Sequence, residues 1–464
     1  MPQKFERSLK LFTLAVIILI GLTGVYAARG LYSDGAYWLV EMLPRGGFYI
    51  FDPHRAYVQV LVQAPVALAI WLGTLDLNSL VRLHSFGFVG VPLIFWIGAL
   101  VLQFKNRLFW LFLMAFTVSY LRSNFFAAGE FSVAYAMTAF CASVLLRQQI
   151  SYLQAALMVV TAVALTHSYE ATLFLGLFLI LLSVVRLLKV QSDHRSIRIL
   201  ILLAVVIFLI SAYVGGRSAL FQRAYDGKGA ANLGALSDVH FLYLIFVPAM
   251  VGLLCTEHTR RFRTVVLASI VTLTGLYLIY AFRWDQSNIS YGYFSYAYRT
   301  LCCFLLLGVL SLAIALRFWS RTEQAKPTAL TANAYLAVGV TIFFSSMAVL
   351  MLYHTHGYYK WAQRFEQEAI ALKTHTPIDK TGINTNHGWT HSYNWGWGNP
   401  SLSILLRGNA EAMVLNHSDQ NSVEPGIYEN IRIGGASLST NQLDFNTYPL
   451  GAIEKNKPLF PKRF

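Results

Sequence analysis

Charged residues are scarce in this sequence, and their scarcity sets its broad class. Asp, Glu, Lys and Arg together make up 12% of the 464 residues, whereas 56% are hydrophobic and the mean hydropathy is +0.52. A soluble globular protein needs far more polar surface than this composition can supply. We therefore expect a polytopic membrane protein whose solvent is the lipid bilayer.

Acidic residues are scarcer than basic ones, and cysteines are few. The 22 Asp and Glu against 36 Lys and Arg give a formal net charge of +14. The basic residues are scattered between apolar runs instead of forming one patch with interleaved aromatics, which favours positive-inside topology over nucleic-acid binding. The four cysteines lack CxxC or Cys/His spacing, so no metal site is predicted from Cys141, Cys255, Cys302 and Cys303.

Long apolar runs dominate what remains. The first, residues 11–28, follows Lys4, Arg7 and Lys10 and fits a signal peptide or a retained transmembrane helix; either sends Arg29 outside. We favour the retained helix and predict eleven spans, each near the ~20 residues that a spanning helix needs or somewhat shorter. The other ten runs are 83–103, 108–121, 127–146, 152–166, 171–186, 199–214, 240–256, 264–282, 299–317 and 331–353.

The apolar run 58–73 decides the topology. It is short and broken by proline, and counting it as a twelfth span would reverse every later loop. With eleven spans, the cytoplasmic segments hold sixteen basic residues in roughly fifty positions. Twelve spans would put the basic segments 186–198 and 260–263 outside. The charge rule therefore favours eleven spans, with 58–73 as a helix that lies in or dips into the outer leaflet.

Two parts of the chain are then expected outside the membrane. Residues 29–82 form a first outer loop with juxtamembrane helices, within a transmembrane domain of residues 1–353. The hydrophobic periodicity stops after the last span, and Gly, Pro and Asn separate short alternating runs such as 412–415 and 431–433. We predict that 354–464 form a small α/β or mostly β domain. The fold class is thus an all-α polytopic membrane protein with this extracytoplasmic addition.

Polar residues gather in the predicted outer loops. Asp34 lies just past the first span, and Asp52-Pro-His-Arg55 follows in the same loop. The next outer loop carries Arg122 and Glu130. Further along, His167 and Glu170 fit a capped turn or a buried polar pair better than a metal site, because a His/Glu pair lacks a third ligand.

This arrangement resembles the GT-C superfamily of membrane glycosyltransferases. The resemblance covers the whole chain as architecture, from the cytoplasmic N-terminus and long first outer loop to the outer C-terminal domain. Ser33-Asp34-Gly35 fits the acidic site of the family's first loop, and 75–85 is similar to the run that follows its membrane-lying helices. Glu130 stands where some members place a second acid. The His-Pro-Pro that several members carry is replaced here by the residues at 52–55.

The resemblance implies an inverting transfer of a sugar from a polyprenyl-phosphate donor to an acceptor hydroxyl on a glycan, a lipid-linked glycan or a protein. Asp34 would be the base, unless it is only a solvated interfacial acid, and Glu130 a second acid, unless it orients Arg122. A divalent cation is left open. Cationic side chains suit the departing phosphate, although Arg217 and Arg223 also suit anionic headgroups. The expected binding residues are His54, Arg55, Arg217, Arg223, Lys228, Arg283 and Arg299.

The densest polar aromatic cluster is residues 387–400, which include Trp395 and Trp397. Exposed Trp and Tyr rings pack well on sugars, so this cluster is a second expected binding element. The same aromatics could also form the core of a small domain that is short of aliphatic residues.

Two rival functions stay open at this stage. An O-antigen ligase or polymerase also uses lipid-linked donors, but it usually depends on Arg and His in a loop between late helices. A transporter would place charged or helix-breaking residues at mid-membrane depth, whereas the apolar runs here are nearly free of charge. We expect a multi-pass protein of a bacterial inner membrane, with its active site facing the periplasm or exterior.

Overall fold

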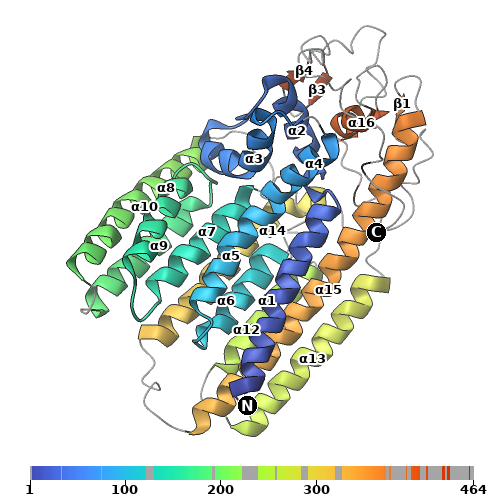
Figure 1. Ribbon diagram of the computed structural model, residues 1–464. Helices are drawn as coiled ribbons and strands as arrows, with labels where there is room; N and C mark the ends of the chain where they lie inside the picture. The colour runs from blue at the N-terminus through green and yellow to red at the C-terminus, as the bar shows by residue number, and fades with distance from the viewer. Residues whose placement is uncertain are drawn as a thin grey trace.

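A computed structural model describes most of the transmembrane part and short pieces of the remainder. The described residues are 3–32, 34–74, 76–121, 130–190, 194–221, 239–255, 259–283, 291–318, 327–371, 376–377, 393, 399–407, 414–415, 431–433, 436–438 and 459. Within them the chain is almost entirely helical, and its long helices form one bundle (Figure 1).

Helices of very different length succeed one another along the chain. The first are α1 (Gln3–Tyr26), η1 (Arg29–Leu31), α2 (Asp34–Arg45), η2 (Pro53–Arg55) and α3 (Ala56–Trp71). Next come α4 (Leu77–Ser85), the π-helical turn η3 (Phe86–Gly90), α5 (Val91–Leu102), α6 (Leu108–Phe116) and the π-helical turn η4 (Thr117–Leu121). The later helices are α7 (Glu130–Leu145), α8 (Tyr152–Leu165), α9 (Thr172–Lys189), α10 (Arg195–Phe221), α12 (Val239–Leu254), α13 (Arg260–Arg283), α14 (Tyr291–Phe318), α15 (Pro327–Ala371) and α16 (Asn399–Arg407).

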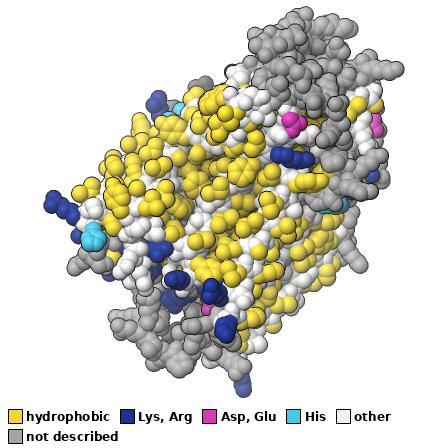
Figure 2. Space-filling model, in the orientation of Figure 1, with side chains coloured by type: hydrophobic (Ala, Val, Ile, Leu, Met, Phe, Trp, Pro, Cys, Tyr) yellow, Lys and Arg dark blue, Asp and Glu magenta, His cyan; other side chains and the backbone are white. Residues whose placement is uncertain are grey.

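The helices confirm a polytopic membrane protein. Within the described residues, seven stretches are long and apolar enough to cross a membrane: 4–26, 77–102, 172–189, 195–218, 261–282, 299–318 and 334–371. Four shorter apolar helices cover 108–121, 130–145, 152–165 and 242–254. Each predicted span falls on one of these helices. Figure 2 shows hydrophobic side chains across the flank of the bundle, where they suit contact with lipid.

The bundle has two distinct ends in Figure 1. We call the end where α1 finishes and where α2 and α3 lie the upper end, and the end near the N-terminus the lower end. α3 begins at the upper end beside the starts of α7 and α9, and its last residue, Trp71, packs on Phe48 just after α2, with ring centroids 5.4 Å apart. Both ends of α3 therefore lie at the upper end, and α3 does not cross the bundle.

Cationic side chains cap helix ends at the lower end. Lys10 donates to the carbonyl oxygen of Phe104, just after α5, at 2.9 Å, and Arg107 donates to that of Leu316 in the last turn of α14 at 3.1 Å. Arg186 donates to carbonyl oxygens at and beyond the end of α7. These carbonyl groups lie in the last turn of a helix or just after it, where the helix supplies no N–H partner, so each contact satisfies an otherwise costly helix end. Basic residues predicted for one side of the membrane thus gather at one end of the bundle.

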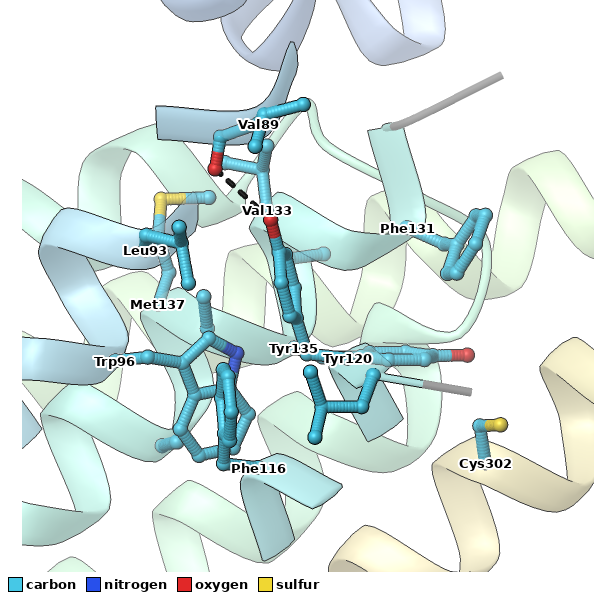
Figure 3. Packing of buried hydrophobic residues seen from close by; sticks show 14 of the residues in the cluster. Val89, Leu93, Trp96, Phe116, Tyr120, Phe131, Val133, Tyr135, Met137 and Cys302 are labelled. Carbon is cyan, nitrogen blue, oxygen red and sulfur yellow. Dashed lines mark hydrogen bonds between the residues drawn. The ribbon is translucent and has the colours of Figure 1, made fainter. Parts of the chain in front are cut away.

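Aromatic side chains fill the core between the two π-helical turns. Tyr120 in η4 donates its hydroxyl to the carbonyl oxygen of Val89 in η3 at 2.9 Å (Figure 3). Trp96 and Phe116 pack edge to face beside this bond, and both are fully buried. A π-helical turn shifts the regular helix hydrogen bonds, and here the tyrosine hydroxyl binds a carbonyl group of such a turn.

The last long helix extends beyond the end of the last predicted span. The boundary expected at residue 353 falls inside α15, which continues to Ala371, because the buried side chains of Tyr358, Trp361 and Phe365 extend its apolar face. Beyond it, β1 (Thr376–Pro377) pairs in parallel with β2 (Val414–Leu415), and β3 (Ile431–Ile433) pairs antiparallel with β4 (Ala436–Leu438). The predicted alternating runs coincide with β2 and β3, and most of the expected domain lies outside the described residues.

Candidate active site

Arg55 is the centre of an ion-pair cluster at the upper end. Asp52 caps η2 by accepting the backbone N–H of His54 at 2.9 Å, so the short helix presents Arg55 toward the bundle. The guanidinium donates from Nη1 to Glu130 Oε2 at 2.9 Å and from Nε to Glu170 Oε1 at 3.1 Å. Asp52 Oδ2 lies 3.5 Å from Nε. Segments that are far apart in sequence, around residues 55, 130 and 170, therefore meet at one point.

Glu130 is fixed through both of its oxygen atoms. It begins α7 and is buried, with 1% of its surface exposed. Arg55 holds Oε2, and Gln59 donates its amide to Oε1 at 2.9 Å. The amide oxygen of Gln59 in turn accepts the backbone N–H groups of Phe51 and Asp52 at 3.1 and 3.3 Å. The carboxylate of Glu130 thus has one orientation, set by α3 and the segment that precedes it.

A second arginine joins this cluster through an aromatic ring. The Arg55 guanidinium lies 5.3 Å from the ring centre of Tyr169, and Arg299 in α14 hydrogen-bonds the Tyr169 side chain. Arg299 is buried and also lies 4.9 Å from the ring centre of Phe131. Burial raises the pKa of Tyr169 against the opposing effect of the Arg299 charge, so its hydroxyl stays neutral.

The charge of the cluster is negative. Three carboxylates, Asp52, Glu130 and Glu170, surround Arg55, and with Arg299 the cluster holds two cations against three acids. Burial lowers the pKa of Arg55, but the charges of Glu130 and Glu170 outweigh burial and hold that pKa well above its ordinary value. Fixed carboxylates suit acceptance of hydroxyl hydrogens better than they suit binding of a phosphate.

The loop after α8 is docked onto η2 by its backbone. His167 accepts the backbone N–H of Tyr57 at 3.1 Å through its carbonyl oxygen, and its Nδ1 lies 3.3 Å from the carbonyl oxygen of Pro53. His167 therefore contacts Pro53 and Tyr57, whereas Glu170 pairs with Arg55. Among the described residues, no group of three or more His, Cys, Asp and Glu side chains could hold a metal ion.

Asp34 lies at the same end of the bundle, on a different turn. It is half-buried and is the first residue of α2, where the helix dipole favours a negative charge. Just before it, the Arg29 guanidinium lies 5.6 and 5.9 Å from the ring centres of Tyr32 and Tyr358. Burial lowers the pKa of Arg29 to about 10, against a smaller opposing effect of nearby tyrosines, so Arg29 remains a cation at neutral pH.

The predicted Trp-rich cluster, residues 387–400, is described only at Tyr393, Asn399 and Pro400. Of these, Tyr393 packs near Arg29. Tyr393 is buried, its hydroxyl lies 3.0 Å from Nδ1 of His354, and its ring packs edge to face on Tyr358. α16, which begins at Asn399, packs against α2. Trp395 and Trp397 themselves lie outside the described residues.

The other predicted binding residues are spread more widely. The structure brings Arg55, Glu130 and Arg299 together, whereas His54 is exposed beside the cluster and Arg217 is exposed on α10. Arg283 ends α13, and its side chain is outside the described part of the chain, as are Arg223 and Lys228.

Gln59 and Glu170 are not among the site residues that the sequence predicts. The available signal for Gln59 was a polar pair, Gln59 and Gln63, four residues apart in an otherwise apolar run and so on one face of a helix. Both side chains are fully buried, and Gln63 binds the backbone N–H and carbonyl groups of Tyr49 at 2.8 Å each. A buried polar stripe in an apolar helix indicates a fixed partner.

Comparison with known proteins finds one partial sequence similarity and no family. No family model matches the chain, and no solved structure matches it significantly. A stretch of 127 residues is 30% identical to Hydrogenase-4 component B of Escherichia coli (strain K12). That stretch is 26% of this chain and only 17% of that protein. A match of this extent does not show a family.

Proposed function

We propose that this protein is a membrane glycosyltransferase of the GT-C type that moves a sugar from a polyprenyl-phosphate donor to an acceptor hydroxyl. The observation that carries the proposal is the meeting of Arg55 with Glu130 and Glu170 at the end of the bundle that also holds Asp34. Charged residues predicted for three separate outer loops, namely Asp34 with Arg55, Glu130, and Glu170, thus lie at the same end of the bundle. A glycan, a lipid-linked glycan or a protein serves as the acceptor.

In this proposal Asp34 is the base of an inverting transfer. The acceptor oxygen bonds to the anomeric carbon of the sugar while its proton passes to the carboxylate. The bond from that carbon to the phosphate oxygen breaks, and its electron pair leaves with the lipid phosphate. Glu130, held by Arg55 and Gln59, is a rigid acceptor for hydroxyl groups of a substrate. Arg55 positions the carboxylates, and the other predicted cations remain as ligands for the phosphate.

The proposed topology has eleven spans in a bacterial inner membrane, with the upper end facing the periplasm or exterior. It is supported by the lower-end contacts of Lys10, Arg107 and Arg186, since cytoplasmic loops carry the excess of basic residues. The central parts of the spans also argue for an enzyme over a transporter, because 86–102, 131–145 and 300–316 contain no Asp, Glu, Lys, Arg or His.

Asp34→Asn tests the function. It removes a base with little change of volume, so sugar transfer should fall by about 10²–10⁴-fold, while expression and binding of the donor lipid stay close to wild type. Transfer from a radiolabelled polyprenyl-phosphate sugar by purified protein in liposomes measures the rate. Glu130→Gln, which retains volume and one acceptor oxygen, should lose less. Near wild-type transfer by Asp34→Asn would remove Asp34 as the base.

A further inference from the structure

The turn that presents Asp34 is folded tightly back on itself. Ala28 has a left-handed backbone (φ 53°, ψ 38°), and the N–H of Gly35 donates to the carbonyl oxygen of Tyr32 at 3.3 Å. A Cβ atom on Gly35 would lie 1.7 Å from the carbonyl oxygen of Gly30, so only glycine fits at Gly35. Asp34 therefore sits on a compact turn whose two ends touch.

Two adjacent residues at the end of α4 hold this turn. Nε2 of His84 lies 2.9 Å from the carbonyl oxygen of Gly35, and the N–H of Gly30 donates to Ser85 Oγ at 3.1 Å. The Ser85 hydroxyl donates in turn to the carbonyl oxygen of Val81 at 2.8 Å. His84 and Ser85 are both fully buried, and a Cβ atom on Gly30 would lie 2.6 Å from the Ser85 Cα. The turn is thus pressed directly onto α4.

The contact with Gly35 fixes the tautomer of His84. A carbonyl oxygen only accepts, so Nε2 must carry the hydrogen. Nδ1 is buried and has no hydrogen-bond partner among the described residues, and the ring packs on Phe88 with centroids 4.9 Å apart. A second proton on Nδ1 would leave a buried charge without a partner, so the imidazole is held neutral. It acts as a fixed single donor to the peptide group next to Asp34.

We propose that His84 is a positioning residue that orients the Asp34 carboxylate by holding the carbonyl group of Gly35. This inference rests on the proposed role of Asp34 as the base. The Gly35 carbonyl group belongs to the peptide after Gly35, so a shift of that group changes the backbone torsions of Gly35 and, through them, the position of the adjacent Asp34. A misplacement of about 1 Å at a reacting group costs on the order of 10²-fold in rate. Ser85 supports the same turn at its other end.

Two substitutions at His84 separate the hydrogen bond from the packing. His84→Gln retains an N–H donor near the position of Nε2, whereas His84→Leu keeps an apolar volume and removes the donor. His84→Leu should lower kcat for sugar transfer by on the order of 10–100-fold with little change in the KM for the donor lipid. His84→Gln should recover most of that loss. Tyr243→Phe, which removes a buried hydroxyl bonded to Thr274 and Ser346, is the control for loss of a buried hydrogen bond.

Hydrogen exchange measured by mass spectrometry gives a readout that does not depend on activity. Peptides that cover residues 28–38 should exchange at least about tenfold faster in His84→Leu and as in wild type in His84→Gln and Tyr243→Phe. Ser85→Ala serves if His84→Leu does not fold, and it should also speed exchange there. Unchanged exchange in the donor-deleted variant, or equal loss of kcat in the Gln and Leu variants, would overturn the proposal. If wild-type protein transfers no sugar, the proposed function fails, while the exchange data still decide whether His84 holds the turn.

Discussion

At the scale of single residues, Arg55 pairs with three carboxylates at the upper end. Its side chain is 14% exposed, so Arg55→Met leaves Asp52, Glu130 and Glu170 close together without their counter-ion. Removing one partner of a buried ion pair typically costs about 3–5 kcal/mol. We expect a loss of that size in the free energy of unfolding, measured by thermal or denaturant unfolding in detergent.

The pH dependence of this effect follows from the raised pKa of Arg55. The folded-state pKa lies above the ordinary value of an arginine side chain, so the stabilisation is fully present below that ordinary value and is lost only as pH rises through the folded pKa. The penalty in Arg55→Met should therefore stay constant from neutral to moderately alkaline pH. Arg217→Met, on an exposed side chain, is the matched control. Equal, small losses in both variants would contradict a structural role for the cluster.

At the scale of elements, α3 offers two glutamines in matched environments. Gln59 holds Glu130, whereas Gln63, one helical turn further on, holds only the backbone of Tyr49. Gln63→Leu leaves the buried backbone of Tyr49 unsatisfied, and Gln59→Leu leaves an oxygen of the buried Glu130 without its donor, so each should cost about 1–3 kcal/mol of stability. Only Gln59→Leu should also slow sugar transfer, since it frees one oxygen of Glu130. Comparing melting temperatures with transfer rates tests this, and parallel effects on both would mean that α3 acts through stability alone.

The helices and strands differ in how well the sequence predicts them. The apolar runs predicted the long helices, because hydrophobic length alone sets a span, and the proline-broken run 58–73 predicted a helix that does not cross the bundle. The end of α15 could not be predicted, because the buried Tyr358 packs on Tyr32 and donates to the carbonyl oxygen of Ala28, which are distant in sequence. β1 and β4 were not predicted, because strands of two or three residues depend on their pairing partner and leave little local signal.

The site was less predictable than the fold for the same physical reason. Arg55 and Glu130 were singled out by type and by predicted side, but nothing local connects residue 55 with residue 130 or with residue 170. The sequence predicts a capped turn or a buried polar pair for His167 and Glu170, whereas the partner of Glu170 is Arg55, 115 positions away in sequence. His84 gave no signal, because a histidine inside an apolar run is usually a core residue. Its contact with Gly35 depends on how α4 packs on the turn after α1.

At the scale of the whole molecule, the backbone of Leu459, far along the chain, is hydrogen-bonded to the helix bundle. Leu459 donates its backbone N–H to Glu366 Oε1 on α15 at 2.7 Å, and its carbonyl oxygen accepts from Arg82 on α4 at 3.1 Å. Arg82 also contacts the carbonyl oxygens that end α1. Glu366→Ala should therefore expose the C-terminal residues to limited proteolysis, whereas Glu368→Ala, two residues further along α15 and only half-buried, should not. Equal protease resistance of both variants would argue against the anchor.

The orientation of the whole molecule in the membrane gives the last prediction. The lower end collects basic side chains that cap helix ends, and the upper end collects the carboxylates, so the charge asymmetry predicts that the lower end faces the cytoplasm. Arg45 at the upper end and Arg195 at the start of α10 both have exposed side chains. In a chain in which Ala replaces the four native cysteines, Arg45→Cys should react with a membrane-impermeant maleimide in intact cells. Arg195→Cys should react only after the cells are permeabilised. The reverse labelling pattern would place Asp34 and the Arg55 cluster in the cytoplasm, where a base for transfer on the outer face has no role.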